Sequence, residues 1–112
     1  MLILRHRFRN QPSMNEQTLQ QENEAYRGTR GVSENNRDRG FQPAFRDSDT
    51  GRIEVSRLQS GEPATMHIIS WLPQEWAAET AADGAVMALK PGIDCGFVSD
   101  GVFYTREQAA EE

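Results

Sequence analysis

The chain of 112 residues is 37% hydrophobic and carries a net charge of −5. This length allows one domain at most, and so few apolar residues build only a thin core. The single cysteine, Cys95, excludes an intrachain disulfide and the usual zinc clusters. No run approaches the roughly 20 apolar residues of a membrane span, and the apolar start followed by charge is the reverse of a signal peptide. We therefore expect a cytoplasmic protein that has no cofactor, no metal and no membrane contact.

Charge and aromatic residues divide the chain near residue 40. Residues 1–40 carry a net charge of +2 and residues 41–112 a net charge of −7, and most of the aromatic residues lie in the second part. We predict a polar, partly disordered, mobile N-terminal arm over residues 1–40 and a small acidic α+β domain over residues 41–112. Because an acidic domain repels phosphate backbones, contact with nucleic acid would have to come through the arm.

The arm contains a weak helix signal and a linker signal. Residues 14–27 are rich in helix formers, but their apolar positions form a poor stripe, so we expect a marginal helix. Residues 28–40 are rich in glycine and asparagine and have little to bury, which is typical of a linker. Three Arg-Gly dipeptides resemble RNA-binding segments, but such segments act through many repeats. Binding of RNA or DNA through the arm is therefore an alternative function.

The domain opens with a predicted hairpin. Pro43 cannot donate to a strand ladder, so residues 41–45 are expected to form an edge strand or an extended lead-in. Residues 52–58 alternate in hydrophobicity, with Ile53 and Val55 pointing one way, which indicates a half-buried strand. The turn between the two strands fits type I, with Gly51 in the left-handed conformation that makes a β-bulge.

The middle of the domain is predicted to run strand, helix, strand. Residues 65–72 have the composition of a short strand. Pro73 suits the first turn of a helix over residues 73–82, and Trp76 would anchor this helix to the sheet. Residues 85–89 follow as another strand.

The clearest element is a hairpin over residues 96–105. Asp100 and Gly101 are the pair that a two-residue type I′ turn requires, because both positions need positive φ. Thr105 followed by Gln108 forms a capping box that opens a short C-terminal helix. Since turns and not crossover helices join the strands, the predicted fold class is α+β: a small antiparallel sheet of short strands with two β-hairpins, one packed helix, a short C-terminal helix and the mobile arm.

Asp49, Thr50 and Gly51 spell the motif of the aspartic proteases. A catalytic aspartate in that motif lies on a buried apolar strand, where it shares a proton with a twin. Here the neighbours are polar, and Arg52 follows the glycine directly. We therefore interpret the motif as a turn, with Asp47 and Asp49 facing water. The spacing of these acids also lacks the glycine and glutamate of a calcium loop, so we expect no metal site there.

His67 and Cys95 are the only plausible pair of base and nucleophile in the domain. A Cys/His enzyme would need the two side chains within hydrogen-bond reach and a stabilised thiolate. Asp94 lies next to Cys95 and disfavours the thiolate, so we favour a packed thiol and a histidine carried by a strand. A Cys/His enzyme stays an alternative, and we assign no catalytic residue.

Without a convergent set of titratable residues, the leading hypothesis is a small, non-enzymatic bacterial protein that binds another protein. A homodimer would also suit so thin a core. The candidate binding residues are Trp71 and Trp76, since tryptophan is frequent at interface hot spots, and Asp47, Asp49 and Asp100. If the two hairpin tips lay side by side, their acids would form one negative edge. A related alternative is that the acidic domain mimics nucleic acid and inhibits a nuclease or a CRISPR-type complex.

Overall fold

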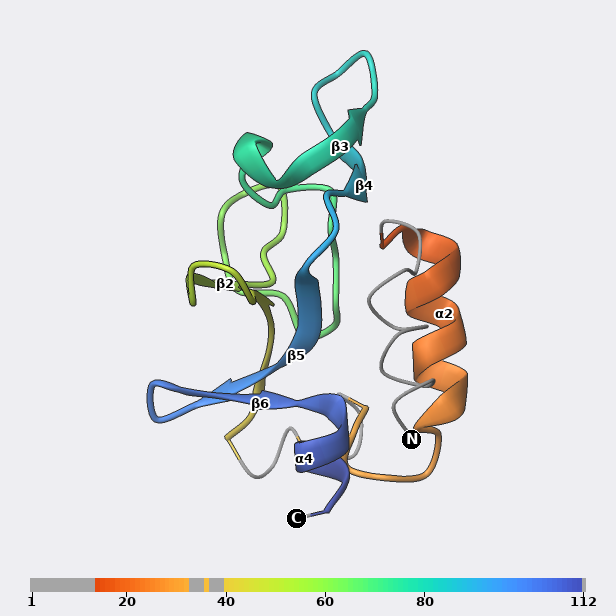
Figure 1. Ribbon diagram of the computed structural model, residues 1–112, viewed down its shortest axis with the longest axis vertical. Coiled ribbons are helices and arrows are strands. Elements are labelled where there is room, and N and C mark those ends of the chain that lie inside the picture. The colour runs from red at the N-terminus through yellow and green to blue at the C-terminus, as the bar shows by residue number, and fades with distance from the viewer. Residues whose placement is uncertain (1–13, 33–35, 37–39, 112) are drawn as a thin grey trace.

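The computed structural model describes residues 14–32, 36 and 40–111, and our expectations for residues 1–13 lie outside the described residues. The predicted α+β class is confirmed, with an N-terminal helix, a four-stranded antiparallel sheet, a separate β-hairpin and a short C-terminal helix (Figure 1). The elements are α2 (Glu16–Ala25), β1 (Gln42–Asp47), β2 (Ile53–Val55), the 3-10 turn η2 (Gln74–Trp76), β3 (Ala77–Thr80), β4 (Val86–Leu89), β5 (Ile93–Ser99), β6 (Val102–Thr105) and α4 (Arg106–Ala110).

The larger sheet has the strand order β2-β1-β5-β6, and all of its neighbouring strands are antiparallel. The β5–β6 hairpin turns as predicted, because Asp100 and Gly101 have φ angles of 52° and 78°. The capping box of Thr105 and Gln108 is also confirmed and starts α4 immediately after β6. Local turn and cap chemistry therefore accounts for the β5–β6 turn and for the start of α4.

The prediction that Pro43 lies in an edge strand is wrong, because β1 pairs with β2 on one side and with β5 on the other. The proline is tolerated since it lies where the β1–β2 ladder ends. Pro43 O accepts a hydrogen bond from Ser56 N at 2.9 Å. Proline has no N–H to donate to Ser56 O in return, and Ala64 N donates to that oxygen instead, at 2.8 Å. A neighbouring loop thus replaces the missing donor.

Two further predictions are wrong. Residues 65–72 form bends and turns instead of a strand, and residues 73–82 form η2 followed by β3 instead of a helix. Alanine and glutamate favour helices locally, but β3 pairs with β4, and that tertiary pairing overrides the weak local preference. Trp76 nevertheless anchors this segment, as expected, because its side chain is 1% exposed within the main hydrophobic cluster.

The helix that packs against the sheet is α2, the element that the sequence marked as marginal. A capping box of Asn15 and Thr18 starts it. Leu19 is buried in the same cluster as Phe45 and Ile69, and Met14 O accepts a hydrogen bond from Leu89 N at 2.8 Å. Figure 1 shows α2 along one side of the sheet, with the β3–β4 hairpin and α4 toward opposite ends of the molecule.

The four-stranded sheet has two unlike faces. We define the inner face as the one that carries Phe45, Cys95 and Phe97, which join the two hydrophobic clusters together with α2, α4 and the segment around β3 and β4. The strand register places ten residues on the opposite, outer face: Gln42, Ala44, Arg46, Ile53, Val55, Asp94, Gly96, Val98, Phe103 and Thr105. In the described part of the chain, neither cluster includes an outer-face residue.

The prediction that Ile53 and Val55 point to the same side of β2 is confirmed, but that side is not the one that packs in the hydrophobic core. Both residues point to the outer face, and Ile53 is 37% exposed. Ser56 takes the inward position and is fully buried, where its hydroxyl donates to Met66 O and accepts from Ile68 N, each at 2.8 Å. A serine can be buried there because both hydrogen-bonding functions of its hydroxyl are satisfied.

We expect Gly96→Ala to destabilise the protein by at least about 3 kcal/mol, because a methyl group there has no room. An added Cβ would collide with Tyr104 O and would lie 2.5 Å from Phe103 Cζ. Gly84→Ala is the matched control, since that position has φ +91° but no atom within 4 Å of an added Cβ. It should lose only about 1 kcal/mol for backbone strain. Urea denaturation measures both, and equal losses would contradict the steric argument.

Candidate functional site

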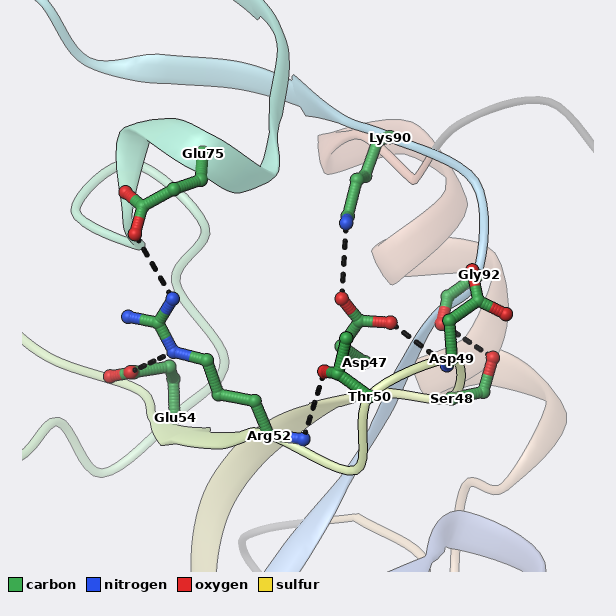
Figure 2. Close-up of polar contacts among 9 residues, drawn as sticks. All are labelled: Asp47, Ser48, Asp49, Thr50, Arg52, Glu54, Glu75, Lys90 and Gly92. Atoms are coloured by element: carbon green, nitrogen blue, oxygen red, sulfur yellow. Dashed lines mark hydrogen bonds and ion pairs between the residues drawn. The ribbon is translucent and has the colours of Figure 1, made fainter.

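The Asp-Thr-Gly motif forms the tip of the β1–β2 hairpin, as predicted. Gly51 has φ +80°, and its N–H donates to Asp47 O at 2.7 Å, while Asp47 N donates to Arg52 O at 2.8 Å. Gly51 and Arg52 thus both bond the single residue Asp47, which is the two-against-one pairing of the expected bulge. Ser48 fastens the tip to the turn before β5, because its N–H and its hydroxyl both donate to Gly92 O at 2.9 Å (Figure 2).

Asp47 does not face water, which corrects our expectation and removes it from the candidate binding residues. It points to the inner face, is 2% exposed and forms an ion pair with Lys90 Nζ at 3.0 Å. Its second oxygen accepts a hydrogen bond from Asp49 N at 2.9 Å, as Figure 2 shows. The hydrogen bond from Lys90 is the main cause that lowers the pKa of Asp47 below its usual value. Asp47 is therefore an ionised structural carboxylate, whereas Asp49 is exposed.

A second set of charges beside the same hairpin is also paired. The Arg52 guanidinium lies 2.9 Å from Glu54 Oε2 and 3.0 Å from Glu75 Oε2 (Figure 2). It also lies over the Trp76 ring, at 5.7 Å from the ring centre. Because Trp76 is buried in the core, it offers a partner no surface, which corrects its assignment as a binding residue. Trp71 is half-buried.

The predicted negative edge does not form. In the β1–β5 ladder, Asp47 lies opposite Ile93, and Gln42 lies opposite Val98. The tip that contains Asp49 is therefore at one end of the sheet, and the tip that contains Asp100 is at the other. Their acids cannot act as one surface.

Arg106 is a buried charged residue that contacts several segments, and no sequence pattern indicated it. Its side chain is 3% exposed, and its Nε lies 3.1 Å from Glu22 Oε1 of α2. Nη1 donates to Gly31 O at 3.0 Å, and Nη2 donates to His67 Nδ1 at 3.3 Å. One guanidinium thus joins α2, the segment that follows it, the loop that carries His67, and α4. No local pattern distinguishes such an arginine from an exposed one.

His67 is held as a neutral imidazole. Because Gly96 O at 2.7 Å can only accept, Nε2 carries the proton, and Nδ1 is left to accept from Arg106. Burial, and then the charge of Arg106, lower the pKa of His67 to about 3. Burial raises the pKa of the Cys95 thiol far above its usual range. With both imidazole nitrogens engaged and the thiol protonated, the pair lacks the chemistry that a Cys/His nucleophile needs.

The outer face carries the remaining distinctive arrangement. The Phe103 ring lies over Gly96, and the Arg46 guanidinium lies over that ring at 4.6 Å from its centre. Arg46 Nη2 also pairs with Asp94 Oδ2 at 3.2 Å. Val55 and Val98 are half-buried around this group. One sequence signal could have revealed the face, because β5 and β6 contain adjacent rather than alternating apolar residues, a pattern of strands that are apolar on both sides.

The described residues include no cluster of three or more His, Cys, Asp or Glu side chains placed to hold a metal ion. No helix in the described part has the length and apolar character that crossing a membrane requires. Comparisons of the chain with protein-family models, with curated proteins and with solved structures find no significant match.

We expect Arg106→Met to cost about 3–5 kcal/mol, because it removes the donors and the charge that compensate the partly buried Glu22 and serve Gly31 O. Urea denaturation measures the loss, and faster labelling of buried Cys95 by a thiol reagent would report release of α2. Arg27→Met is the control, since the Arg27–Glu24 pair at 3.5 Å is exposed and should contribute less than about 1 kcal/mol. Similar losses in the two variants would contradict the anchoring role.

The buried neutral His67 should make stability depend on pH. Its pKa is about 3 in the folded protein and about 6.5 in an unfolded chain, so the unfolded state binds the proton first as the pH falls. The free energy of unfolding should therefore fall between pH 7 and pH 5 by about 2 kcal/mol from this residue. The His67→Gln variant lacks that contribution. Denaturation of both proteins at the two pH values tests this, and an identical pH dependence would refute it.

Proposed function

We propose that this chain is a small, non-enzymatic, cytoplasmic protein-interaction module that binds another protein through the outer face of its four-stranded sheet. The observation that carries the proposal is a group of apolar side chains on the outer face that belongs to neither hydrophobic cluster of the described residues. Ile53 is exposed, Val55 and Val98 are half-buried, and none of the three belongs to a hydrophobic cluster of the described residues.

The outer face carries apolar side chains beside the polar Gln42, Arg46, Asp94 and Thr105, which is unusual for a sheet of this type. Antiparallel sheets with one face on the core normally present polar side chains to water on the other. The charged members of this face are Arg46 and Asp94, and they pair with each other. Phenylalanine and arginine are enriched in interface cores, whereas most charged residues are depleted there. The composition of the outer face therefore supports a docking role.

The other groups considered from the sequence give less support to a competing function. Asp47, Arg52 and Lys90 are engaged in ion pairs within the protein. His67 and Cys95 are engaged or protonated in the interior, so an enzymatic function has no candidate nucleophile among them.

We expect Ile53→Asp to abolish capture of a partner while the fold is retained, because a carboxylate would have to be desolvated within the contact. The measurement compares affinity capture from cell extract by the original chain and by this variant, with the near-ultraviolet circular dichroism of both recorded to verify folding. Ile53 is already 37% exposed, so its replacement should cost the free protein little stability.

Met87→Asp is the matched control, since Met87 is 55% exposed on β4, outside the four-stranded sheet. It should capture the same partner as the original chain. Capture that survives Ile53→Asp, or that fails equally in both variants, would overturn the assignment of the outer face.

A further inference from the structure

The helix α2 is attached to the rest of the protein by few apolar contacts. Leu19 is the one buried residue among its ten residues, and Met14, just before the helix, is partly buried against the same hydrophobic cluster. A helix shorter than about 12–15 residues is marginal in water, so α2 depends on these contacts for its structure. Few buried apolar contacts are typical of an element that opens locally.

The charges of α2 weaken it further. Glu22 and Glu24 lie in its last turn, which has no basic residue, and acidic side chains there oppose the helix dipole. Burial raises the pKa of Glu22 in spite of the nearby Arg106, because the loss of hydration destabilises the carboxylate more than the ion pair stabilises it. The Glu22–Arg106 pair therefore sets where α2 lies more than how strongly it is held.

The backbone of α2 takes no part in the strand ladders. Among the described residues, the backbone of Glu16–Ala25 bonds only within the helix and to the residues that flank it. The backbone contacts with β4 come just before the helix, where Met14 O accepts from Leu89 N at 2.8 Å and Asn15 forms an isolated bridge with Ala88. The helix can therefore leave the sheet without breaking a ladder.

The other described elements keep their own packing without α2. One of the two hydrophobic clusters, formed by Phe41, Phe97 and Ala109, contains no residue of the helix. The ladders among β2, β1, β5 and β6, and the pairing of β3 with β4, also use none of its residues. Opening of α2 is therefore separable from unfolding of the sheet.

The closed helix helps to bury Cys95. This residue lies on the inner face of β5, is 6% exposed, belongs to the cluster that contains Leu19, and interacts with Glu22 and Arg106. Because the chain has no other cysteine, the reactivity of its thiol reports whether α2 is in place.

We propose that α2 is a releasable latch on the inner face: it separates as one unit while the four-stranded sheet and the β3–β4 hairpin stay folded, and Cys95 and Arg106 then become accessible to solvent. The latch acts on the face opposite to the one proposed to bind a partner, so it stands or falls independently of that function. It gives the chain two states that differ in which charged and thiol groups the inner face presents.

The test measures labelling of Cys95 in the full chain by a small disulfide reagent. The labelling rate, divided by the rate for the unfolded chain, gives the fraction of molecules in which the thiol is exposed. We expect this fraction to exceed the unfolded fraction obtained from urea denaturation by at least about tenfold. Hydrogen exchange should likewise be at least about tenfold faster for amides of α2 than for amides of the β1–β5 ladder.

Either of two results would overturn the latch: a thiol that is exposed no more often than the chain unfolds, or amides of α2 that exchange at the same rate as those of β5.

Two variants separate local opening from global unfolding. Leu19→Ala removes the main apolar contact of α2 and should speed labelling of Cys95 by at least about tenfold. Phe41→Leu weakens the cluster that α2 does not join, so it should lower the urea midpoint while labelling stays within about twofold of the original rate. The latch is refuted if Phe41→Leu speeds labelling in proportion to its loss of stability, or if Leu19→Ala leaves labelling unchanged.

Discussion

In the described part of the chain, the packing of several segments depends on the buried cation Arg106. A buried guanidinium needs partners for its charge and its donors: Glu22 supplies the opposite charge, Gly31 O accepts from Nη1 and His67 Nδ1 accepts from Nη2. These residues come from segments far apart in the chain, so their shared partner fixes where α2 and the loop of His67 meet the sheet. The anchoring explains how a helix with one buried apolar residue, Leu19, holds its place on a small core.

Because α2 and the β3–β4 hairpin pack on the inner face, the two faces of the four-stranded sheet differ. The inner face is covered, and the outer face is filled from within by Phe103 lying over Gly96 and by Arg46 lying over Phe103. The Phe103 ring fills the space beside Gly96, and it also places the Arg46 guanidinium above an apolar surface. Phe103 and Arg46 therefore stabilise the outer face and also form part of the surface proposed to bind a partner.

The charges of the chain divide into those used by the fold and those left to the surface. Asp47 and Lys90 hold the first hairpin to the turn before β5, and Arg52 joins its strand to η2 through Glu75. The acidic composition therefore does not by itself define an acidic binding surface. What distinguishes the outer face is the apolar surround of its one stacked arginine.

The sequence by itself determined the features that a few adjacent residues control: the turn at Asp100 and Gly101, the left-handed Gly51, the cap at Thr105 and the α+β class. Only the tertiary structure decided that residues 77–80 extend against β4, that β1 is central, and that Asp47 is buried while Ile53 is exposed. The physical reason is that these outcomes depend on partners distant in the chain, such as Lys90 for Asp47 and β4 for β3. Local propensity is too weak to oppose such contacts, and no local pattern encodes them.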